Sequence, residues 1–312
     1  MHEQPKGKKA GWSWYLRVAG TVLSILLLLW LLWRQDWNAI LNSIKGLPLW
    51  IFLVSFGLLI IRHTWNAVRW FILVRAQDIP IRFSKALKLV VTGLFASNFL
   101  PSMVGGDVVR IAGIIQESDD RIAGAASVIV DRVMGVIGML FVLPFSAPLI
   151  SLIFSKGLFF GGIIGSKNSK WIDAIRESIR KSLASLKIWL SQPGALLLAL
   201  LASWLGILSY AISVLILAGE LGIPVTLADV VGASTLTYFI TMIPISINGY
   251  GIRELTILSF YTHFGGSVEQ ATALALITRF LFLLVSLPGA FWVGEILQNQ
   301  GSVNQYLEKE IE

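Results

Sequence analysis

Residues 101–110 read Pro-Ser-Met-Val-Gly-Gly-Asp-Val-Val-Arg and follow directly on an apolar run. Pro101 removes a backbone donor and clashes with the preceding turn of any helix it enters. Gly105 and Gly106 allow backbone conformations that other residues resist. The stretch therefore predicts a helix that breaks and then restarts, with Arg110 beside the break.

A second stretch repeats this pattern. Residues 244–253 read Pro-Ile-Ser-Ile-Asn-Gly-Tyr-Gly-Ile-Arg, with Gly251 as an additional glycine. Three residue types recur at identical spacing, namely Pro101, Gly106 and Arg110 in the first stretch and Pro244, Gly249 and Arg253 in the second. Two broken helices, each beside an arginine, are typical of a transport site built from an internal repeat.

The composition is that of a polytopic membrane protein. Of the 312 residues, 55% are hydrophobic and only 14% are charged, and the mean hydropathy is +0.75. A soluble domain is usually about 25% charged, and several apolar runs here approach the roughly 20 residues that span a bilayer. No polar stretch is long enough for a soluble domain, so we expect one all-α membrane domain over residues 1–312.

Six full membrane spans and two re-entrant hairpins account for the apolar segments. We expect the spans at 18–33, 49–75, 123–143, 146–165, 195–218 and 269–297. The first hairpin joins a helix over 84–100 to a short helix that starts near Asp107, which can cap it. The second joins a helix over 228–243 to a partner over 248–262. A 17-residue helix is about 25 Å long, which is nearly a full crossing of the bilayer. If the first helix of each hairpin crosses fully, the number of helices rises to as many as ten.

The distribution of lysine and arginine predicts the orientation. The N-terminus, residues 75–88 and residues 166–193 are rich in both, whereas the 219–229 loop has neither. Cytoplasmic loops carry the excess of these residues, so we expect both termini in the cytoplasm and the 219–229 loop outside. Apolar residues recur at helical spacing in 166–193, which favours an amphipathic helix on the membrane surface; the alternative is a solvated connecting helix.

The two hairpins belong to an internal repeat in which residues 49–145 correspond to 195–292. Asp78-Ile-Pro-Ile precedes the first hairpin and Gly222-Ile-Pro-Val precedes the second. The first hairpin starts from the cytoplasm and the second from outside, so the repeat has inverted topology. Such repeats place a substrate site near the midplane, where broken helices meet.

One part of the repeat matches less well. Each break is followed by a span that contains an arginine, Arg132 in the first unit and Arg279 in the second. The offsets of these residues from Arg110 and Arg253 differ by four residues, about one helical turn. The equivalence of Arg132 and Arg279 is therefore weaker than that of the breaks.

Six arginines and three carboxylates lie within the predicted membrane segments: Arg62, Arg69, Arg110, Arg132, Arg253, Arg279, Asp107, Asp131 and Glu254. Ionisable groups are costly there and usually face an interior or a water-filled cavity. The surplus of positive charge favours an anionic ligand, and the planar fork of arginine donors suits phosphate. Backbone N–H groups at the start of a broken helix add to such a site. We therefore predict that these nine residues bind substrate.

Structural roles stay open for some of them. Arg62 and Arg69 share a helix face with Asn66 and could instead snorkel to an interface. Arg132, beside Asp131, could belong to a structural ion pair with a partner on another helix. The glycines of the breaks shape the backbone whatever the function.

No motif for catalysis, metal binding or cofactor binding stands out. The three histidines have no metal-ligand spacing, and there is no nucleophile–base motif, phosphate-binding loop or dinucleotide fingerprint. The absence of cysteine excludes disulfides and thiol chemistry. The net charge of +7 fits loops that face an anionic leaflet better than nucleic-acid binding. We expect neither an enzyme nor a cofactor.

Three motifs in order resemble one known family. They are residues 100–110, then Ser127-Val-Ile-Val-Asp-Arg, then residues 243–254. They look like the lysylphosphatidylglycerol synthase transmembrane region, also called the flippase-like domain family, over about residues 15–295. The resemblance implies lipid translocation. Multiple peptide resistance factors add a cytoplasmic aminoacyl-transfer domain, so we expect a stand-alone member that lacks it.

We therefore predict a cell-membrane protein that flips an amphiphile with an anionic head group, of the phospholipid or polyprenyl-phosphate type. A carrier of a small soluble anion would share the repeat and the arginines. A membrane glycosyltransferase-associated protein that acts on polyprenyl-linked sugar is a third possibility. Since no ATP-binding motif is present, movement would be passive or ion-coupled, with Asp107, Asp131 and Glu254 as candidates for proton coupling.

Overall fold

The computed structural model describes residues 44–99, 105–118, 120–150, 189–242 and 249–293. These residues form helices and turns, with no strand among them, which confirms the predicted all-α fold. The helices, with the 3-10 turns η1 and η3, are α3 (Leu49–Arg75), α4 (Phe83–Phe99), α5 (Gly105–Ile115), α6 (Arg121–Val142), η1 (Leu143–Ser146), α9 (Pro193–Glu220), α10 (Leu227–Met242), α11 (Ile252–His263), α12 (Val268–Ser286) and η3 (Leu287–Gly289).

The order of elements occurs twice. A long helix, two short helices and a long helix follow one another in α3–α6, with lengths of 27, 17, 11 and 22 residues. The same order returns in α9–α12, with lengths of 28, 16, 12 and 19 residues. We call α3–η1 the first unit and α9–η3 the second unit.

Within the part of the chain that the structure describes, four helices are long and apolar enough to cross a membrane: Leu49–Arg75, Ile122–Ile150, Pro193–Glu220 and Val268–Val293. They match the spans predicted at 49–75, 123–143, 195–218 and 269–297. The boundary predicted between spans at 143 and 146 is wrong, because η1 carries the helix on to Ile150. The span at 18–33, residues 151–165 of the next predicted span and residues 166–188 of the predicted surface helix lie outside the described residues.

The first helix break joins α4 and α5 in a tight hairpin. The two helices approach so closely that the residues at their contact must be glycine. A Cβ atom on Gly93 of α4 would lie 2.8 Å from the carbonyl oxygen of Gly106 in α5. Helix α5 begins at Gly105, two residues earlier than predicted. Asp107 therefore lies in the first turn of α5 and not at its N-cap.

The second break is longer than predicted. Helix α11 begins at Ile252, whereas its start was expected at Asn248. Gly249 and Gly251 have φ values of +70° and +80°, in the left-handed region that glycine enters at little cost. The two glycines therefore delay the second helix by several residues.

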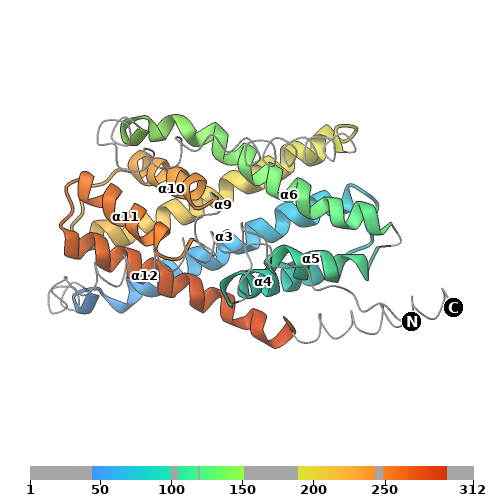
Figure 1. Cartoon of the computed structure of the whole chain (residues 1–312), viewed down its shortest axis with the longest axis horizontal. Helices are drawn as coiled ribbons and strands as arrows, with labels where there is room; N and C mark the ends of the chain where they lie inside the picture. Colours follow the sequence, from blue (N-terminus) through green and yellow to red (C-terminus); the bar gives the residue numbers. More distant parts are fainter. Residues whose placement is uncertain (1–43, 100–104, 119, 151–188, 243–248, 294–312) are drawn as a thin grey trace, which may run out of the picture.

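Helices α3 and α9 pack against each other through the middle of the molecule (Figure 1). The Ser213 hydroxyl donates to the Ser55 carbonyl at 3.1 Å, and further along Arg69 Nη1 lies 3.3 Å from Ser203 Oγ. These contacts show that the two helices run antiparallel. An inverted repeat requires this of its two first helices; the symmetry of the whole units stays a prediction.

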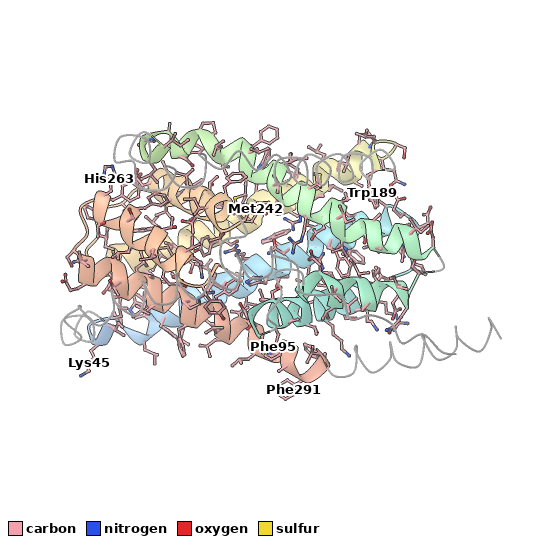
Figure 2. All side chains as sticks on the ribbon, viewed as in Figure 1. Lys45, Phe95, Trp189, Met242, His263 and Phe291 are labelled. Carbon is pink, nitrogen blue, oxygen red and sulfur yellow. The ribbon has the colours of Figure 1, made fainter. Side chains whose placement is uncertain are left out.

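The two breaks contact each other. The Tyr250 hydroxyl, within the second break, donates at 3.1 Å to the carbonyl oxygen of Asn98, which precedes the first break. In Figure 2, Phe95 of α4 and Met242 at the end of α10 both lie near the middle of the long axis. The helix ends therefore gather at the centre of the bundle.

The last helix of each unit ends against the other unit. η1 and η3 both contain a Leu-Pro pair. The Ser146 hydroxyl of η1 donates to the Gly232 carbonyl of α10 at 2.9 Å. A Cβ atom on Gly289 of η3 would lie 2.9 Å from the Cα atom of Thr92 in α4. This crossed packing depends on glycine at both contacts and joins the two units.

Each unit also has buried apolar residues of its own. In the first unit, Trp70 of α3 and Leu89 of α4 belong to one fully buried cluster with residues of α5. In the second unit, Leu217 of α9 packs in a cluster with Leu274 and Leu281 of α12.

The predicted inversion can be tested by cysteine labelling, since the chain has no cysteine of its own. Pro224 lies exposed in the α9–α10 loop, and Ser84 lies exposed at the start of α4. We expect a Pro224→Cys variant to react with an impermeant maleimide from outside intact cells. A Ser84→Cys variant should react only after permeabilisation. Labelling of both from the same side would exclude an inverted repeat.

Candidate functional site

A polar cavity with two adjoining lobes lies where the helix breaks meet. The larger lobe, of about 500 Å³, is lined by residues of α3, α5 and α6 together with residues of α9 and α10, and we call it the α5 lobe. The smaller lobe, of about 280 Å³, is lined mainly by α9–α12, and we call it the α11 lobe. Arg62, Tyr210, Tyr238 and Thr241 line both lobes, which therefore adjoin each other.

The structure brings eight of the nine predicted site residues to this cavity. The α5 lobe is lined by Arg69, Asp107, Arg110, Asp131 and Arg132, the α11 lobe by Arg253 and Arg279, and both lobes by Arg62. Glu254 does not line the cavity but bonds to Arg279. Arg110 and Arg253, which recur at the same spacing beside the two breaks, line different lobes.

Asp131 is the charged centre of the α5 lobe. Its side chain, in the middle of α6, accepts from Arg69 Nε at 2.6 Å through one oxygen. The other oxygen accepts from Arg110 Nη2 at 2.8 Å. Asp131 is only 2% exposed, so both contacts are sheltered from water. A single carboxylate thereby ties α3, α5 and α6 together.

Arg132 forms an ion pair with Asp107 of α5 and not with a residue on its own helix. Its side chain is 55% exposed, so this pair is far more open than the contacts of Asp131. Arg110 Nη1 lies 4.0 Å from the same Asp107, and its guanidinium stacks 4.3 Å from the Trp70 ring. The α5 lobe therefore has a carboxylate beside each of its own arginines.

Glu254 organises the start of α11. One of its oxygens accepts from the backbone N–H of Gly251 at 2.8 Å, which caps the helix. The other accepts from Arg279 Nε of α12 at 2.7 Å. Arg279 also stacks 4.0 Å from the Tyr250 ring, while its buried Nη2 atom has no hydrogen-bond partner. Arg279 therefore faces the α11 lobe with part of its donor set unused.

The two carboxylates are equivalent in a way that the sequence pattern obscured. Asp107 and Glu254 are each the third residue of the second hairpin arm. Each pairs with an arginine 25 residues further on, in the helix that follows. The four-residue mismatch between Arg132 and Arg279 disappears in this register. Matching the two units by their prolines and glycines gave a wrong register, because α11 begins further after Pro244 than α5 begins after Pro101.

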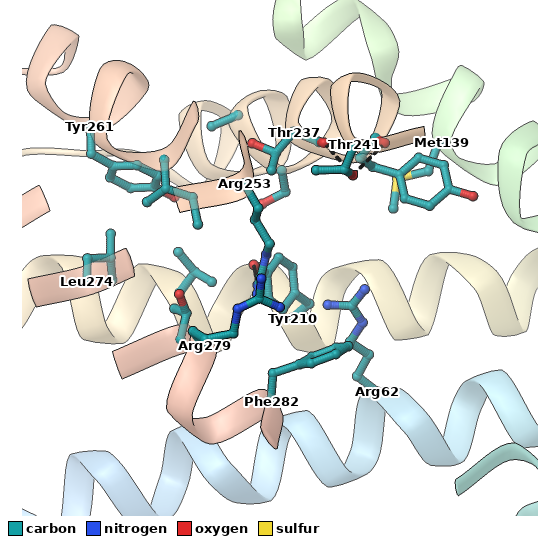
Figure 3. Close-up of a pocket in the computed structure, with 16 residues that line it drawn as sticks. Arg62, Met139, Tyr210, Thr237, Thr241, Arg253, Tyr261, Leu274, Arg279 and Phe282 are labelled. Atoms are coloured by element: carbon teal, nitrogen blue, oxygen red, sulfur yellow. Dashed lines mark hydrogen bonds between the residues drawn. The ribbon is translucent and has the colours of Figure 1, made fainter. Parts of the chain in front are cut away.

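Arg62 and Arg253 share a neutral partner, Tyr210 (Figure 3). Arg253 Nη2 donates to the Tyr210 hydroxyl at 3.1 Å, and the Arg62 guanidinium stacks 4.2 Å from the Tyr210 ring. Among the described residues, no ion pair within 4.0 Å includes either arginine. Arg62 and Arg253 are therefore the two arginines of the cavity that form no ion pair with a described carboxylate.

Sequence reasoning missed Tyr210. The only signal for it is that it is the one tyrosine in the apolar span over 195–218. Tyr238 and Tyr261 were missed as well, and both line the α11 lobe. None of the described residues forms a group of three or more potential metal ligands from His, Cys, Asp and Glu. What the cavity offers a ligand is thus a set of guanidinium and hydroxyl groups.

Comparison with known proteins agrees with the three motifs. A family model described as "Lysylphosphatidylglycerol synthase TM region" matches residues 17–289. The match confirms the predicted resemblance, which we placed at about 15–295. No curated protein and no solved structure matches the chain.

Proposed function

This chain belongs to the lysylphosphatidylglycerol synthase transmembrane-region family, and from that premise we propose that it moves a lipid with an anionic head group across the cell membrane. The family relation and the four membrane-crossing helices make it a multi-pass membrane protein. We further propose that both termini are cytoplasmic and that the protein is a transporter without enzyme activity.

One observation carries the proposal. An arginine-rich cavity, lined by helices of both units, lies where two broken helices meet. A lipid head group that crosses the bilayer needs polar partners at the depth of the acyl chains, because unpaired polar groups there are costly. Six arginines against three carboxylates suit an anion, and the planar fork of an arginine can donate to two oxygens of one phosphate group.

The two lobes suggest a path. The head group would pass between the α5 lobe and the α11 lobe beside Arg62 and Tyr210, which line both. The acyl or prenyl chains would stay in the surrounding lipid. Movement would be passive or ion-coupled, with Asp107, Asp131 and Glu254 as the candidate proton carriers.

Lipid movement can be measured in vesicles. The protein is reconstituted with a phospholipid that has an anionic head group and a fluorescent acyl chain, and dithionite quenches only the outer leaflet. We expect the parent protein to expose the inner lipid, and Arg110→Ala and Arg253→Ala to slow this about ten-fold or more. A hydrogen bond to a charged group contributes roughly 1.5–3 kcal/mol, and lysine lacks the fork geometry, so Arg→Lys should restore movement only in part.

Arg75 supplies the matched control. It is exposed at the end of α3 and lines neither lobe, so Arg75→Ala removes the same charge and should leave the rate unchanged. If both cavity variants moved lipid like the parent, the two arginines would be structural. If the parent moved soluble phosphate but no anionic lipid, the protein would be a solute carrier and the proposal would fail.

A further inference from the structure

We infer that the α11 lobe is a binding site for a phosphate monoester with two negative charges, held between Arg62, Arg253 and Arg279. The inference rests on the proposed function, because it names the class of head group that the same cavity would take. The inference gives the α11 lobe a role that the α5 lobe does not have, whereas the sequence pattern indicated a single arginine-rich site.

The α5 lobe offers a bound anion a weaker site than the α11 lobe does, because Arg69, Arg110 and Arg132 already form ion pairs with its own carboxylates. Both oxygens of Asp131 are engaged, one by Arg69 and one by Arg110. Arg132 is engaged by Asp107. A ligand in this lobe would have to displace charge-assisted bonds that are among the strongest in proteins.

The α11 lobe has the opposite character. No Asp or Glu is among the described residues that line it. Arg253 bonds to the neutral hydroxyl of Tyr210, and Arg62 stacks on the ring of the same residue. Both guanidinium groups therefore keep most of their five N–H donors for a ligand.

Arg279 adds an independent sign of a missing partner. Arg279 lines the lobe and is 9% exposed, and its Nη2 atom is buried without a hydrogen bond. Arg110 Nε in the α5 lobe is the other arginine atom of this kind among the described residues. An unsatisfied buried donor costs about 1–3 kcal/mol, more when it is charged. Figure 3 shows Arg62, Arg253 and Arg279 gathered around Tyr210, each from a different helix. An acceptor with several oxygens would satisfy all three.

The charge of the lobe points to a dianion. Arg62, Arg253 and Arg279 carry three positive charges, and Glu254 compensates Arg279, which leaves two. Uncompensated charge in a protein interior is costly. A phosphate monoester carries about −1.5 to −2 at pH 7 and presents three acceptor oxygens, whereas a phosphodiester carries a single charge. The volume, about 280 Å³, lies just below the roughly 300–1,000 Å³ of pockets that enclose a whole ligand, so it suits a compact head group.

A pair of short-chain lipids tests the charge preference directly. Dioctanoyl phosphatidic acid is a monoester, and dioctanoyl phosphatidylmethanol differs from it by one methyl ester and one charge. Binding of each to the full chain in detergent at pH 7.5 is measured by calorimetry. We expect the parent protein to bind the monoester about ten-fold or more tightly than its methyl ester.

The preference should depend on the arginines of the α11 lobe. Arg62→Gln and Arg253→Gln leave no described carboxylate unpaired, so they suit the test better than Arg279→Gln, which would strand Glu254. Each should weaken monoester binding about ten-fold and bring the ratio of the two affinities close to one. Arg75→Gln, the exposed control, should keep the parent ratio. Size-exclusion profiles establish that each variant is folded before binding is measured.

Two results would overturn the inference. One is equal affinity of the parent for both lipids, and the other is a folded Arg62→Gln, Arg253→Gln double variant that retains the preference. Inorganic phosphate separates the possible sources of the ligand: as a competitor it should need concentrations about a hundred-fold above the lipid. If inorganic phosphate competed at the same concentration as the lipid, the ligand of the lobe would be free phosphate and the assignment to a lipid would be wrong.

The vesicle assay tests the proposed function and the binding assay tests the inference, so a negative result in one does not require a negative result in the other. Lipid movement without a monoester preference would leave the proposed function standing and remove the inference. A monoester preference without lipid movement would do the reverse.

Discussion

Replacing Asp131 with alanine is expected to destabilise the protein by about 3–5 kcal/mol, the cost of removing one partner from a buried ion pair. The change leaves two arginines, Arg69 and Arg110, without the carboxylate that both contact. It also removes a side chain that ties α3, α5 and α6 together. The loss would appear as a large drop in the unfolding midpoint of the detergent-solubilised protein.

Asp120 gives a control on the same helix. It caps α6 by accepting from the backbone N–H groups of Ile122 and Ala123, and it is exposed. Asp120→Ala should cost only about 1 kcal/mol, as is usual for an N-cap. If the two variants unfolded at the same midpoint, Asp131 would not be the structural anchor described above.

The second large effect concerns the two equivalent ion pairs. Glu254→Gln should cost about 3–5 kcal/mol, because it leaves Arg279 without its carboxylate at a site where both side chains are about 10% exposed or less. Asp107→Asn should cost about 1 kcal/mol or less, because its partner Arg132 is 55% exposed. The same kind of substitution at equivalent positions therefore predicts a clear difference in unfolding midpoint.

Both variants keep the size and shape of the side chain, so the comparison isolates charge. A glutamine at 254 can still accept from the Gly251 backbone N–H, and the helix cap should survive. Equal midpoints for the two variants would mean that burial does not set the strength of these pairs. A larger loss for Asp107→Asn would mean that Arg132 is more sheltered than its exposure indicates.

Much of the fold could be predicted because the signals for it are local. The apolar run over 49–75 and the helix over 228–243 were placed within one residue of α3 and α10. The number of residues between the two helices of each hairpin was not predicted correctly. The first residue of α5 and of α11 depends on which of the nearby glycines adopt a non-helical conformation. Gly249 and Gly251 both adopt positive φ before α11 begins, and nothing in the Pro-Gly-Arg spacing shows that. The expected equivalence of Arg110 and Arg253 followed from that spacing, whereas the equivalent contacts are those of Asp107 and Glu254.

The candidate site was predicted as a set of charges but not as a structure. All six arginines reach the cavity, since an ionisable group in an apolar helix has few other places to lie. Which arginine meets which carboxylate depends on contacts between distant helices, such as Arg69 with Asp131. Tyr210 carries no charge and sits in an otherwise apolar span, so no sequence rule singled it out as the partner of two arginines.

The crossed packing of η1 on α10 and of η3 on α4 affects the order in which the chain can mature during synthesis. Chains emerge from the ribosome N-terminus first, and early segments commonly fold before later ones exist. Here the surface of α4 around Thr92 is covered only when Gly289, near the end of the described chain, packs against it. The first unit is thus incomplete until the second has been inserted. Premature termination after α11 would leave a defect near the start of the protein as well as at its end.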